Sequence, residues 1–318
     1  DENDEKYEND ESDERDEKYE SDESDERDGS DESDENSEKS NSFIDEESQN
    51  DLLPKRKNIS LARLRECFVV VTVCARNVEQ HIPLFQRNIK QILSIFKDYR
   101  ILLGESDSSD ETLTSLLKWS ADDAEHIIVE SYGNMLNYIS DRTVRIAYCR
   151  NHLLETARKN GWLANAAYYL VLDVDVNANS ILTLQNFLTN FEYNLSDWDV
   201  MTASQVMGYY DIWALRTKKV VNYDCWKMVG HYRELGYCQG SLVEAFVLAH
   251  KHTIPRDHKL IEVQSAFGGF GVYNTRYLNG CIYSGYEYQD SICEHVSFHE
   301  CIRRNGGRIF INPKFQNA

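Results

Sequence analysis

The sequence predicts an α/β protein with a mostly parallel central sheet flanked by helices, preceded by a disordered acidic tail. Three observations lead to this prediction. Continuous apolar runs, rich in β-branched residues, alternate along the chain with stretches whose apolar residues recur at helical spacing. Such alternation is typical of a sheet whose strands are parallel and buried on both faces. The first fifty residues differ sharply from the rest in charge and in hydrophobicity.

The acidic tail is predicted to span residues 1–55. Its first fifty residues contain 25 Asp and Glu against 5 Lys and Arg, and DEKYENDESDERD from Asp4 is followed by the similar DEKYESDESDERD from Asp16. Such a segment buries too little apolar surface to offset the entropy of an ordered chain. A solvating tail is the simplest interpretation. The alternative is a regulatory arm that kinases modify or that binds a basic partner.

The folded part is predicted to span residues 56–318, enough for one sizeable domain. This part has 28 acidic and 28 basic side chains, so the net charge of −20 belongs to the tail. A neutral domain without a long basic run is not expected to bind nucleic acid. No apolar run approaches the roughly twenty residues that a membrane span needs, and the acidic N-terminus is unlike a signal peptide.

The eight cysteines are scattered through the folded part without a CxxC pair or the spacing of a zinc site. We therefore expect free thiols and a reducing compartment. Together with the lack of a span or a signal peptide, this predicts a cytoplasmic protein. The alternative is an anchor in a preceding segment that the given sequence does not contain.

The first four elements are predicted to be strand, helix, strand and helix. Residues 67–77, CFVVVTVCARN, are a β-branched run that ends in a polar turn, and the next helix begins near Pro83. Residues 100–108, RILLGESDS, form the second strand, and residues 110–124 form the second helix. Both strands end in short polar turns. In such a sheet, ligands bind beyond the carboxyl ends of the strands.

A third helix, residues 142–161, precedes the stretch YYLVLDVDV at residues 168–176. If the strand continues through this stretch, alternation places Asp173 and Asp175 on one face. Two carboxylates this close raise each other's pKa unless a cation lies between them, and Mg²⁺ or Mn²⁺ is a cation that carboxylates bind well. The alternative interpretation is a turn whose aspartates cap the next helix, residues 177–190.

The order of these elements resembles that of glycosyltransferases of the GT-A fold: a strand with a polar turn, a strand ending in ESDSSDET, a helix with RxxxxRNxL, and an apolar strand that runs into DxD. Four stretches resemble, more narrowly, the capsule-associated α-1,3-mannosyltransferase family of encapsulated yeasts. They are YDIWALR from Tyr210, RIAYCRNHLL from Arg145, SAFGGFGVYN from Ser265 and CEH from Cys293. The resemblance covers most of residues 66–315. An acidic repeat tail on such an enzyme is also similar to enzymes that large DNA viruses encode.

This resemblance implies transfer of a hexose from a nucleotide sugar, GDP-mannose or a UDP-sugar, to a glycan or a protein-linked acceptor. It implies a nucleotide-sugar half at about residues 66–180 and an acceptor half at about residues 181–318. The implied cofactor is Mn²⁺ or Mg²⁺, because a divalent cation neutralises the charge that develops on a diphosphate leaving group.

On the donor side, the resemblance implies that Asp175 is a direct metal ligand and a catalytic residue. Asp173 would bind the metal through a water molecule or hold hydroxyl groups of the donor. Arg150 would lie near the diphosphate, and the alternative for it is an exposed position on its helix. Arg76 and Asp107, in the turns after the first two strands, would contact the nucleotide.

Glu294 is the second predicted catalytic residue. In an inverting enzyme it would be the general base that takes the proton of the acceptor hydroxyl. In a retaining enzyme, which the narrower family implies, it would position the acceptor or the donor. His295 and His299 lie four residues apart on one helical face, so they are candidate metal ligands. The alternative for both histidines is packing inside the domain.

Acceptor-binding residues are predicted on two further stretches. Tyr210, Asp211 and Trp213 combine aromatic faces with a carboxylate, which is a common way to bind a sugar ring. The equal alternative is that the aromatic residues belong to the core. Gly268 and Gly269 allow the backbone to approach a ligand closely, and a tight bend at the edge of the sheet is the equal alternative.

Two other functional classes stay open. A metal-dependent nucleotidyltransferase also uses paired carboxylates, but it usually carries a Gly-rich phosphate loop after its first strand, where this chain has ARNVE at residues 75–79. A catalytically inactive module that binds a nucleotide sugar or a glycan would keep the strand ends and the aromatic residues. Such a module would not need a carboxylate pair together with Glu294.

Overall fold

The structure is a computed structural model that describes residues 42–46, 61–288 and 290–318. These residues belong to one compact unit, Asn41–Ala318. Most of the predicted acidic tail therefore lies outside the described residues.

Among the described residues, the central sheet has eight strands in the order β3-β2-β1-β4-β7-β5-β10-β6. Six of these run in one direction, and β7 and β6 run in the opposite direction. A two-stranded ribbon pairs β8 with β9. The strands are β1 (Phe68–Ala75), β2 (Asp98–Glu105), β3 (Ile127–Ser131), β4 (Tyr168–Leu172), β5 (Val200–Ser204), β6 (Ile261–Val263), β7 (Phe270–Asn274), β8 (Tyr286–Glu287), β9 (Asp290–Ser291) and β10 (Ile309–Gln316).

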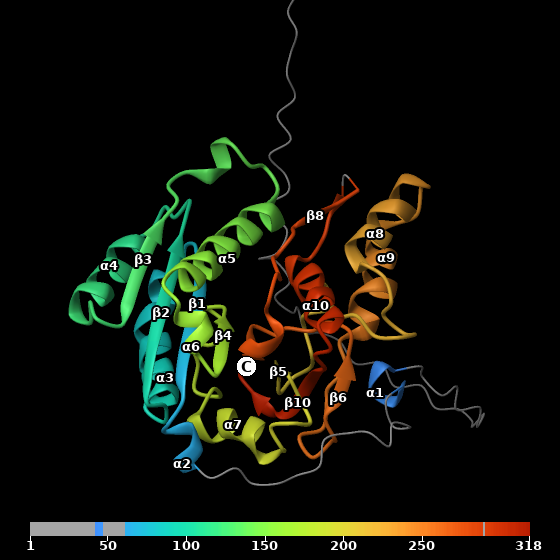
Figure 1. The fold of residues 1–318 in the computed structure, drawn as a ribbon. Helices are drawn as coiled ribbons and strands as arrows, with labels where there is room; N and C mark the ends of the chain where they lie inside the picture. The colour runs from blue at the N-terminus through green and yellow to red at the C-terminus, as the bar shows by residue number, and fades with distance from the viewer. Residues whose placement is uncertain (1–41, 47–60, 289) are drawn as a thin grey trace, which may run out of the picture. The chain divides into compact units, whose positions relative to one another are not determined.

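Helices flank this sheet (Figure 1). They are α1 (Phe43–Glu46), α2 (Leu61–Leu64), α3 (Ile82–Leu93), α4 (Thr112–Asp122), α5 (Arg142–Lys159), α6 (Trp162–Asn165), α7 (Leu184–Leu188), α8 (Cys225–Glu234), α9 (Gln239–Phe246) and α10 (Glu294–Arg304). Short 3-10 helices occupy Glu79–His81, Met135–Asn137, Thr189–Glu192, Leu248–His250 and Thr275–Tyr277.

The strand β1 illustrates how the core forms on both faces of the sheet. Val69 and Val71 belong to one apolar cluster, together with Phe85 of α3. Val70, which points to the other face, belongs to a second cluster with Leu153 of α5. The predicted fold class, an α/β protein with a mostly parallel sheet flanked by helices, is therefore confirmed.

Several strands are absent from the sequence prediction, and β3 shows why. The edge strand β3, IIVES, is only partly buried along most of its length, so it lacks the continuous apolar run by which the inner strands are recognised.

The helix α1 lies within the residues that the sequence assigns to the tail. The side chain of Phe43 is fully buried, with its ring centroid 6.2 Å from that of Tyr209 and 5.8 Å from that of His252. At residues 42–46 the structure therefore differs from the predicted tail without fixed structure. The physical reason is the pair Phe43 and Ile44, two adjacent apolar residues in an otherwise polar segment.

Two disulfides correct the expectation that every cysteine is a free thiol. Cys74 of β1 is bonded to Cys149 of α5, and Cys281 is bonded to Cys301 of α10, with Cα atoms 6.2 and 5.4 Å apart. The paired residues are 75 and 20 positions apart in the sequence, so the fold brings them together and their spacing does not reveal it. The remaining cysteines, Cys67, Cys225, Cys238 and Cys293, are free. The cysteines thus give no support to a reducing compartment.

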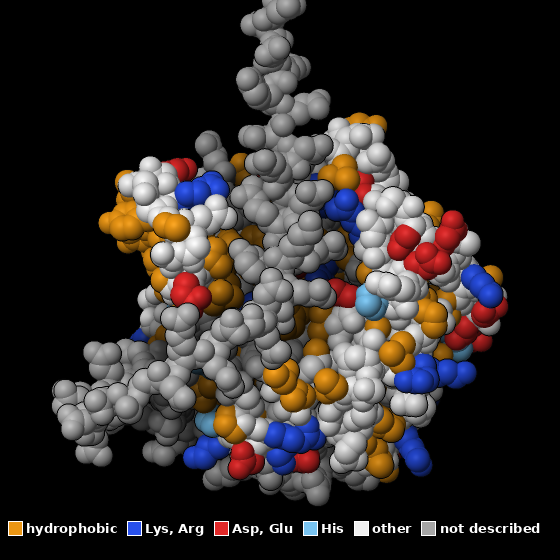
Figure 2. Space-filling view, turned by 180° about the vertical axis from the view of Figure 1, so that it is seen from behind, with side chains coloured by type: hydrophobic (Ala, Val, Ile, Leu, Met, Phe, Trp, Pro, Cys, Tyr) orange, Lys and Arg blue, Asp and Glu red, His pale blue; other side chains and the backbone are white. Residues whose placement is uncertain are grey.

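None of the described helices has the length and the apolar composition needed to cross a bilayer. Figure 2 shows the face opposite to that of Figure 1. Where grey atoms leave this face visible, acidic and basic side chains are interspersed, as expected for a folded part with equal numbers of both.

Candidate functional site

The candidate site begins where the chain leaves β4. This strand is buried at all five of its residues, and the next residue, Asp173, donates its N–H to Gly269 O at 3.0 Å. Residues 174–177 form a turn, so the prediction that the strand continues to Val176 is wrong. Asp173 is partly buried, whereas Asp175 is exposed. The positions of both carboxylates are therefore set by a turn and not by alternation along a strand.

A network of buried amides, which the sequence analysis missed, fixes this turn. Asn177 donates from Nδ2 to Asp173 O and to Gly269 O, both at 2.7 Å. Asn317 donates from Nδ2 to Gly268 O at 2.9 Å and to Asn177 Oδ1 at 3.1 Å. Both asparagines are fully buried. Hydrogen-bonded amides of this kind specify one backbone conformation. In the sequence, they are visible only as polar residues that follow apolar strands.

Arg150 of α5 connects two of the predicted acidic residues. It donates from Nη2 to Asp173 Oδ1 at 3.1 Å and from Nε to Glu294 Oε1 at 2.9 Å. The side chain is buried, and its guanidinium carbon lies 5.1 and 5.9 Å from the ring centroids of Phe267 and Tyr283. An exposed position on the helix is therefore excluded for Arg150, and the structure brings Arg150, Asp173 and Glu294 together.

Negative charge exceeds positive charge at this point. The carboxylates of Asp173, Asp175, Asp211 and Glu294 act on one another, with Arg150 between two of them. Burial raises the pKa of Asp173 to about 7; Arg150 lowers it, and the three other carboxylates raise it further. Burial also raises the pKa of Asp211. Such an excess of carboxylates favours the binding of a cation.

Gly268 and Gly269 turn the chain tightly into β7, beside the end of β4. Their φ angles are 62° and 76°, which side chains rarely adopt. A Cβ atom on Gly268 would lie 2.6 Å from Ala203 O, and one on Gly269 would lie 3.1 Å from the hydroxyl oxygen of Tyr210. Gly268 also donates its N–H to Asp211 Oδ2 at 3.0 Å. The tight-bend interpretation thus accounts for both glycines.

Two of the three side chains predicted to bind the acceptor lie at the cluster. Desolvation of its hydroxyl, and then the charges of Asp211 and Asp173, raise the pKa of Tyr210 well above its usual value, although the residue as a whole is 37% exposed. Trp213 instead donates from Nε1 to both carboxylate oxygens of Asp224, at 3.1 and 3.0 Å. The structure does not bring Trp213 to the cluster.

His299 lies in the core of the domain. Its Nδ1 is 2.8 Å from Ser265 Oγ, and its Nε2 is 3.0 Å from the hydroxyl oxygen of Tyr273. Burial, and to a smaller extent the charge of Arg150, lowers the pKa of His299 to about 3. The imidazole is therefore neutral, and hydrogen bonds occupy both of its nitrogen atoms.

His295 lies nearer to the cluster. Its ring stacks on that of Phe267 with centroids 3.8 Å apart, and its Nε2 is 3.5 Å from Glu294 Oε1. Neither ring nitrogen has a hydrogen-bond partner among the described residues. Burial lowers the pKa of His295 well below its usual value. Within the part of the chain that the structure describes, no three His, Cys, Asp or Glu side chains form a ready metal site.

The two predicted nucleotide contacts lie together at the ends of neighbouring strands. Ala75 and Glu105, the last residues of β1 and β2, pair in the sheet. In the turns that follow, Arg76 donates from Nε to Asp107 O at 3.4 Å. Arg145 Nε lies 4.0 Å from Asp107 Oδ2 and adds a second guanidinium to this edge. Since β1 also pairs with β4, these turns and the carboxylate cluster share one edge of the sheet.

Comparisons with known proteins give the following results. No protein-family model and no curated protein matches the chain. Among solved structures, TarS 1–349 from S. aureus is 14% identical over 76% of this chain and 57% of its own, with a TM-score of 0.42. The mannosyltransferase PcManGT from Pyrobaculum calidifontis, in complex with GDP-Man and Mn²⁺, is 11% identical over 77% of this chain and 56% of its own, with a TM-score of 0.38. The glucosyl-3-phosphoglycerate synthase from M. tuberculosis is 13% identical over 73% of this chain and 67% of its own, with a TM-score of 0.35.

At these identities and TM-scores, the similarities show neither the family nor the activity of the chain. The matched part spans little more than half of the TarS 1–349 chain.

Proposed function

We propose that the chain is a metal-dependent glycosyltransferase that moves a hexose from a nucleotide sugar to a glycan or a protein-linked acceptor. The observation that carries this proposal is the pair of contacts by which Arg150 holds Asp173 and Glu294. These residues lie at the carboxyl edge of the parallel strands, where α/β sheets bind ligands. The donor is GDP-mannose, which the sequence resemblance implies, or a UDP-sugar.

The donor set at the cluster fits a divalent cation such as Mn²⁺ or Mg²⁺. Asp175 is exposed and the side chain of Asp173 is 34% exposed, so both offer carboxylate oxygens to solvent. We propose these two residues as the metal ligands. Phosphate oxygens and water would complete the coordination, as is usual for Mg²⁺. His295 is the remaining candidate, whereas the hydrogen bonds of His299 argue against it as a ligand.

A metal ion bound here would neutralise the charge that develops on the departing diphosphate. The chain's own residues would orient the reactants. Arg150 fixes Oε1 of Glu294, and Oε2 accepts a weak hydrogen bond from the Cys293 thiol at 4.0 Å. In an inverting reaction Glu294 would take the proton of the acceptor hydroxyl, and in a retaining reaction it would hold that hydroxyl in position. Arg76 and Asp107 would contact the nucleotide.

Calorimetric titration of the full chain with GDP, UDP, GDP-mannose and UDP-glucose, each with and without Mn²⁺, tests this proposal. We expect one nucleotide and its sugar to bind, and only with the metal. In Glu294→Gln the donor should still bind while transfer to an acceptor falls. Failure of all four compounds to bind would contradict the proposed function.

A further inference from the structure

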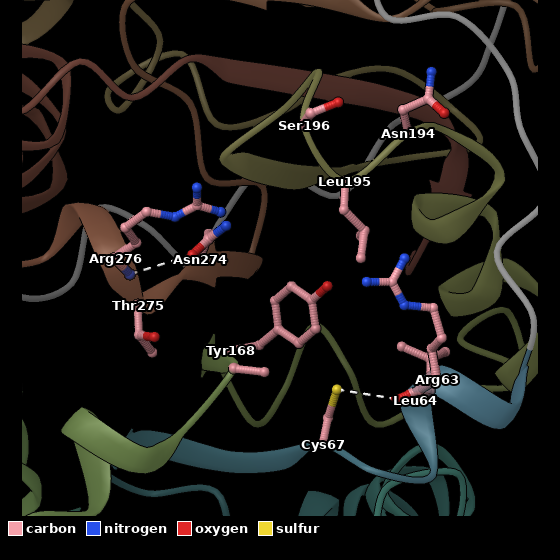
Figure 3. A pocket seen from close by; sticks show the side chains of 11 residues that line it. Arg63, Leu64, Cys67, Tyr168, Asn194, Leu195, Ser196, Asn274, Thr275 and Arg276 are labelled. Carbon is pink, nitrogen blue, oxygen red and sulfur yellow. Dashed lines mark hydrogen bonds between the residues drawn. The ribbon is translucent and has the colours of Figure 1, made fainter.

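A pocket of about 630 Å³ lies at the opposite edge of the sheet from the carboxylate cluster (Figure 3). Its lining includes Cys67, which precedes β1, Tyr168, the first residue of β4, and Asn274, the last residue of β7. Because Asp173 follows the other end of β4, about 17 Å of extended chain separates Tyr168 from it. The pocket volume is within the usual range for small-molecule sites.

Two arginines give this pocket a positive charge. Arg63 comes from α2 and Arg276 from the turn after β7, and none of the residues that line the pocket is Asp or Glu. Neither guanidinium makes a hydrogen bond or an ion pair with the described residues. The charge of Arg276 acts on Asp199, but this carboxylate accepts the Arg308 N–H at 2.9 Å and does not line the pocket.

Tyr168 provides an independent observation. Its side chain is only 5% exposed, and its ring stacks on that of Trp198 with centroids 6.0 Å apart. Its hydroxyl nevertheless makes no hydrogen bond to any residue that the structure describes. Figure 3 shows the ring between Arg63 and Arg276, and the charges of both arginines act on the hydroxyl. With no partner among the described residues, this hydroxyl is available to a ligand.

We propose that the pocket binds a small organic phosphate through Arg63, Arg276 and Tyr168. Guanidinium groups present forked donors that match phosphate oxygens, and a phenol adds a further donor. The apolar side chains of Leu64 and Leu195 line the same space and would contact the organic part of the ligand. The volume exceeds what inorganic phosphate alone would fill. This proposal does not depend on the transferase activity.

Calorimetry of the full chain tests the proposal with three probes: glucose 6-phosphate, inorganic phosphate and glucose. We expect glucose 6-phosphate to bind more tightly than phosphate, and glucose not to bind. Arg63→Gln and Arg276→Gln should each weaken glucose 6-phosphate binding about tenfold or more, since each removes a charged hydrogen bond. Tyr168→Phe keeps the ring and should weaken binding by a few-fold. The matched control is Arg65→Gln, which changes an exposed arginine outside the lining and should leave the affinity unchanged.

The cluster near Asp173 could also attract phosphate compounds, so the same titrations are repeated with Asp175→Asn. Binding that survives Asp175→Asn and weakens in Arg63→Gln and Arg276→Gln supports the pocket. Binding that is lost in Asp175→Asn but unchanged in Arg63→Gln and Arg276→Gln would overturn the proposal. Equal affinities in the Arg63, Arg276 and Arg65 variants would also overturn it. So would the absence of any phosphate binding. Circular dichroism of each variant confirms that the fold is retained.

Discussion

Arg150 Nε lies 2.9 Å from Glu294 Oε1, although the two residues are 144 positions apart in the chain. The contact joins the middle of α5 to the first residue of α10. The same guanidinium also contacts Asp173, so one buried arginine forms ion pairs with two carboxylates. Removing it leaves both carboxylates without their partner.

We therefore expect Arg150→Gln to lower the free energy of unfolding by about 3–5 kcal/mol, the range for breaking a buried ion pair. Chemical denaturation measures this change. The control is Arg142→Gln, an exposed arginine of the same helix, which should shift the value by no more than about 0.5 kcal/mol. Equal losses in the two variants would show that the Arg150 contacts do not stabilise the domain.

Gly268→Ala should be among the most destabilising small substitutions, because the new Cβ would meet the backbone oxygen of Ala203. A positive φ and this overlap together predict a loss of about 2–4 kcal/mol. Gly280→Ala is the matched control, since Gly280 has a φ of 71° but no atom within 4 Å of the added Cβ. Its loss should be about 1 kcal/mol, from conformation alone. Thermal or chemical denaturation of both variants separates the two effects.

His299 should make the domain sensitive to acid. Its pKa is about 3 in the folded state, because of burial and Arg150, and about 6.5 in an unfolded chain. As the pH falls below about 6.5, His299 binds a proton in the unfolded chain but not in the folded chain. Stability is then lost by up to about 1.4 kcal/mol per pH unit. In His299→Gln the free energy of unfolding should depend less steeply on pH between about 7 and 5. Parallel curves would contradict this prediction.

The two disulfides should stabilise the domain to different extents. In the chain-entropy account, the bond between Cys74 and Cys149, which closes the longer loop, contributes about 4 kcal/mol, and that between Cys281 and Cys301 about 3 kcal/mol. Replacing each pair by serines and measuring unfolding in denaturant tests the order. Cys238→Ser, at an exposed free thiol, should have almost no effect. A larger loss from the second pair than from the first would contradict the ranking.

Asp175→Asn should abolish the metal-dependent part of donor binding and leave the fold intact, because Asp175 is exposed and its carboxylate is a proposed ligand. Calorimetry with and without Mn²⁺ measures the effect, and denaturation confirms the stability. Unaltered turnover in this variant would contradict the assignment of Asp175 as a metal ligand.

The sequence predicts the fold class and the proximity of two candidate residues, because both depend on strong local patterns. Buried strands such as β1 and β4 are continuous apolar runs, and polar residues at their ends meet at one edge of a parallel sheet. That rule brings Arg76 and Asp107 together, as the structure shows. The contact between Arg150 and Glu294 is not predicted: the resemblance implies a place for Arg150 near the diphosphate and for Glu294 near the acceptor.

Other features depend on contacts between distant residues and could not be read from local sequence. The pairing of Cys74 with Cys149 requires α5 to pack on β1. The end of β4 is set by hydrogen bonds from Asn177, so a strand that looks continuous stops at Leu172. Trp213 is held by Asp224, a partner that aromatic composition alone does not suggest.

The boundary between β4 and β7 divides the sheet into two halves. One half consists of β1 to β4, and the other consists of all later strands of the sheet. The chain thus completes one half of the sheet before it begins the second. A polypeptide cut after Ser180 would yield two fragments with contiguous half-sheets. Arg150 and Asp173 would be on one fragment, and Asp211 and Glu294 on the other. The carboxylate cluster would therefore form again only if the two fragments associate.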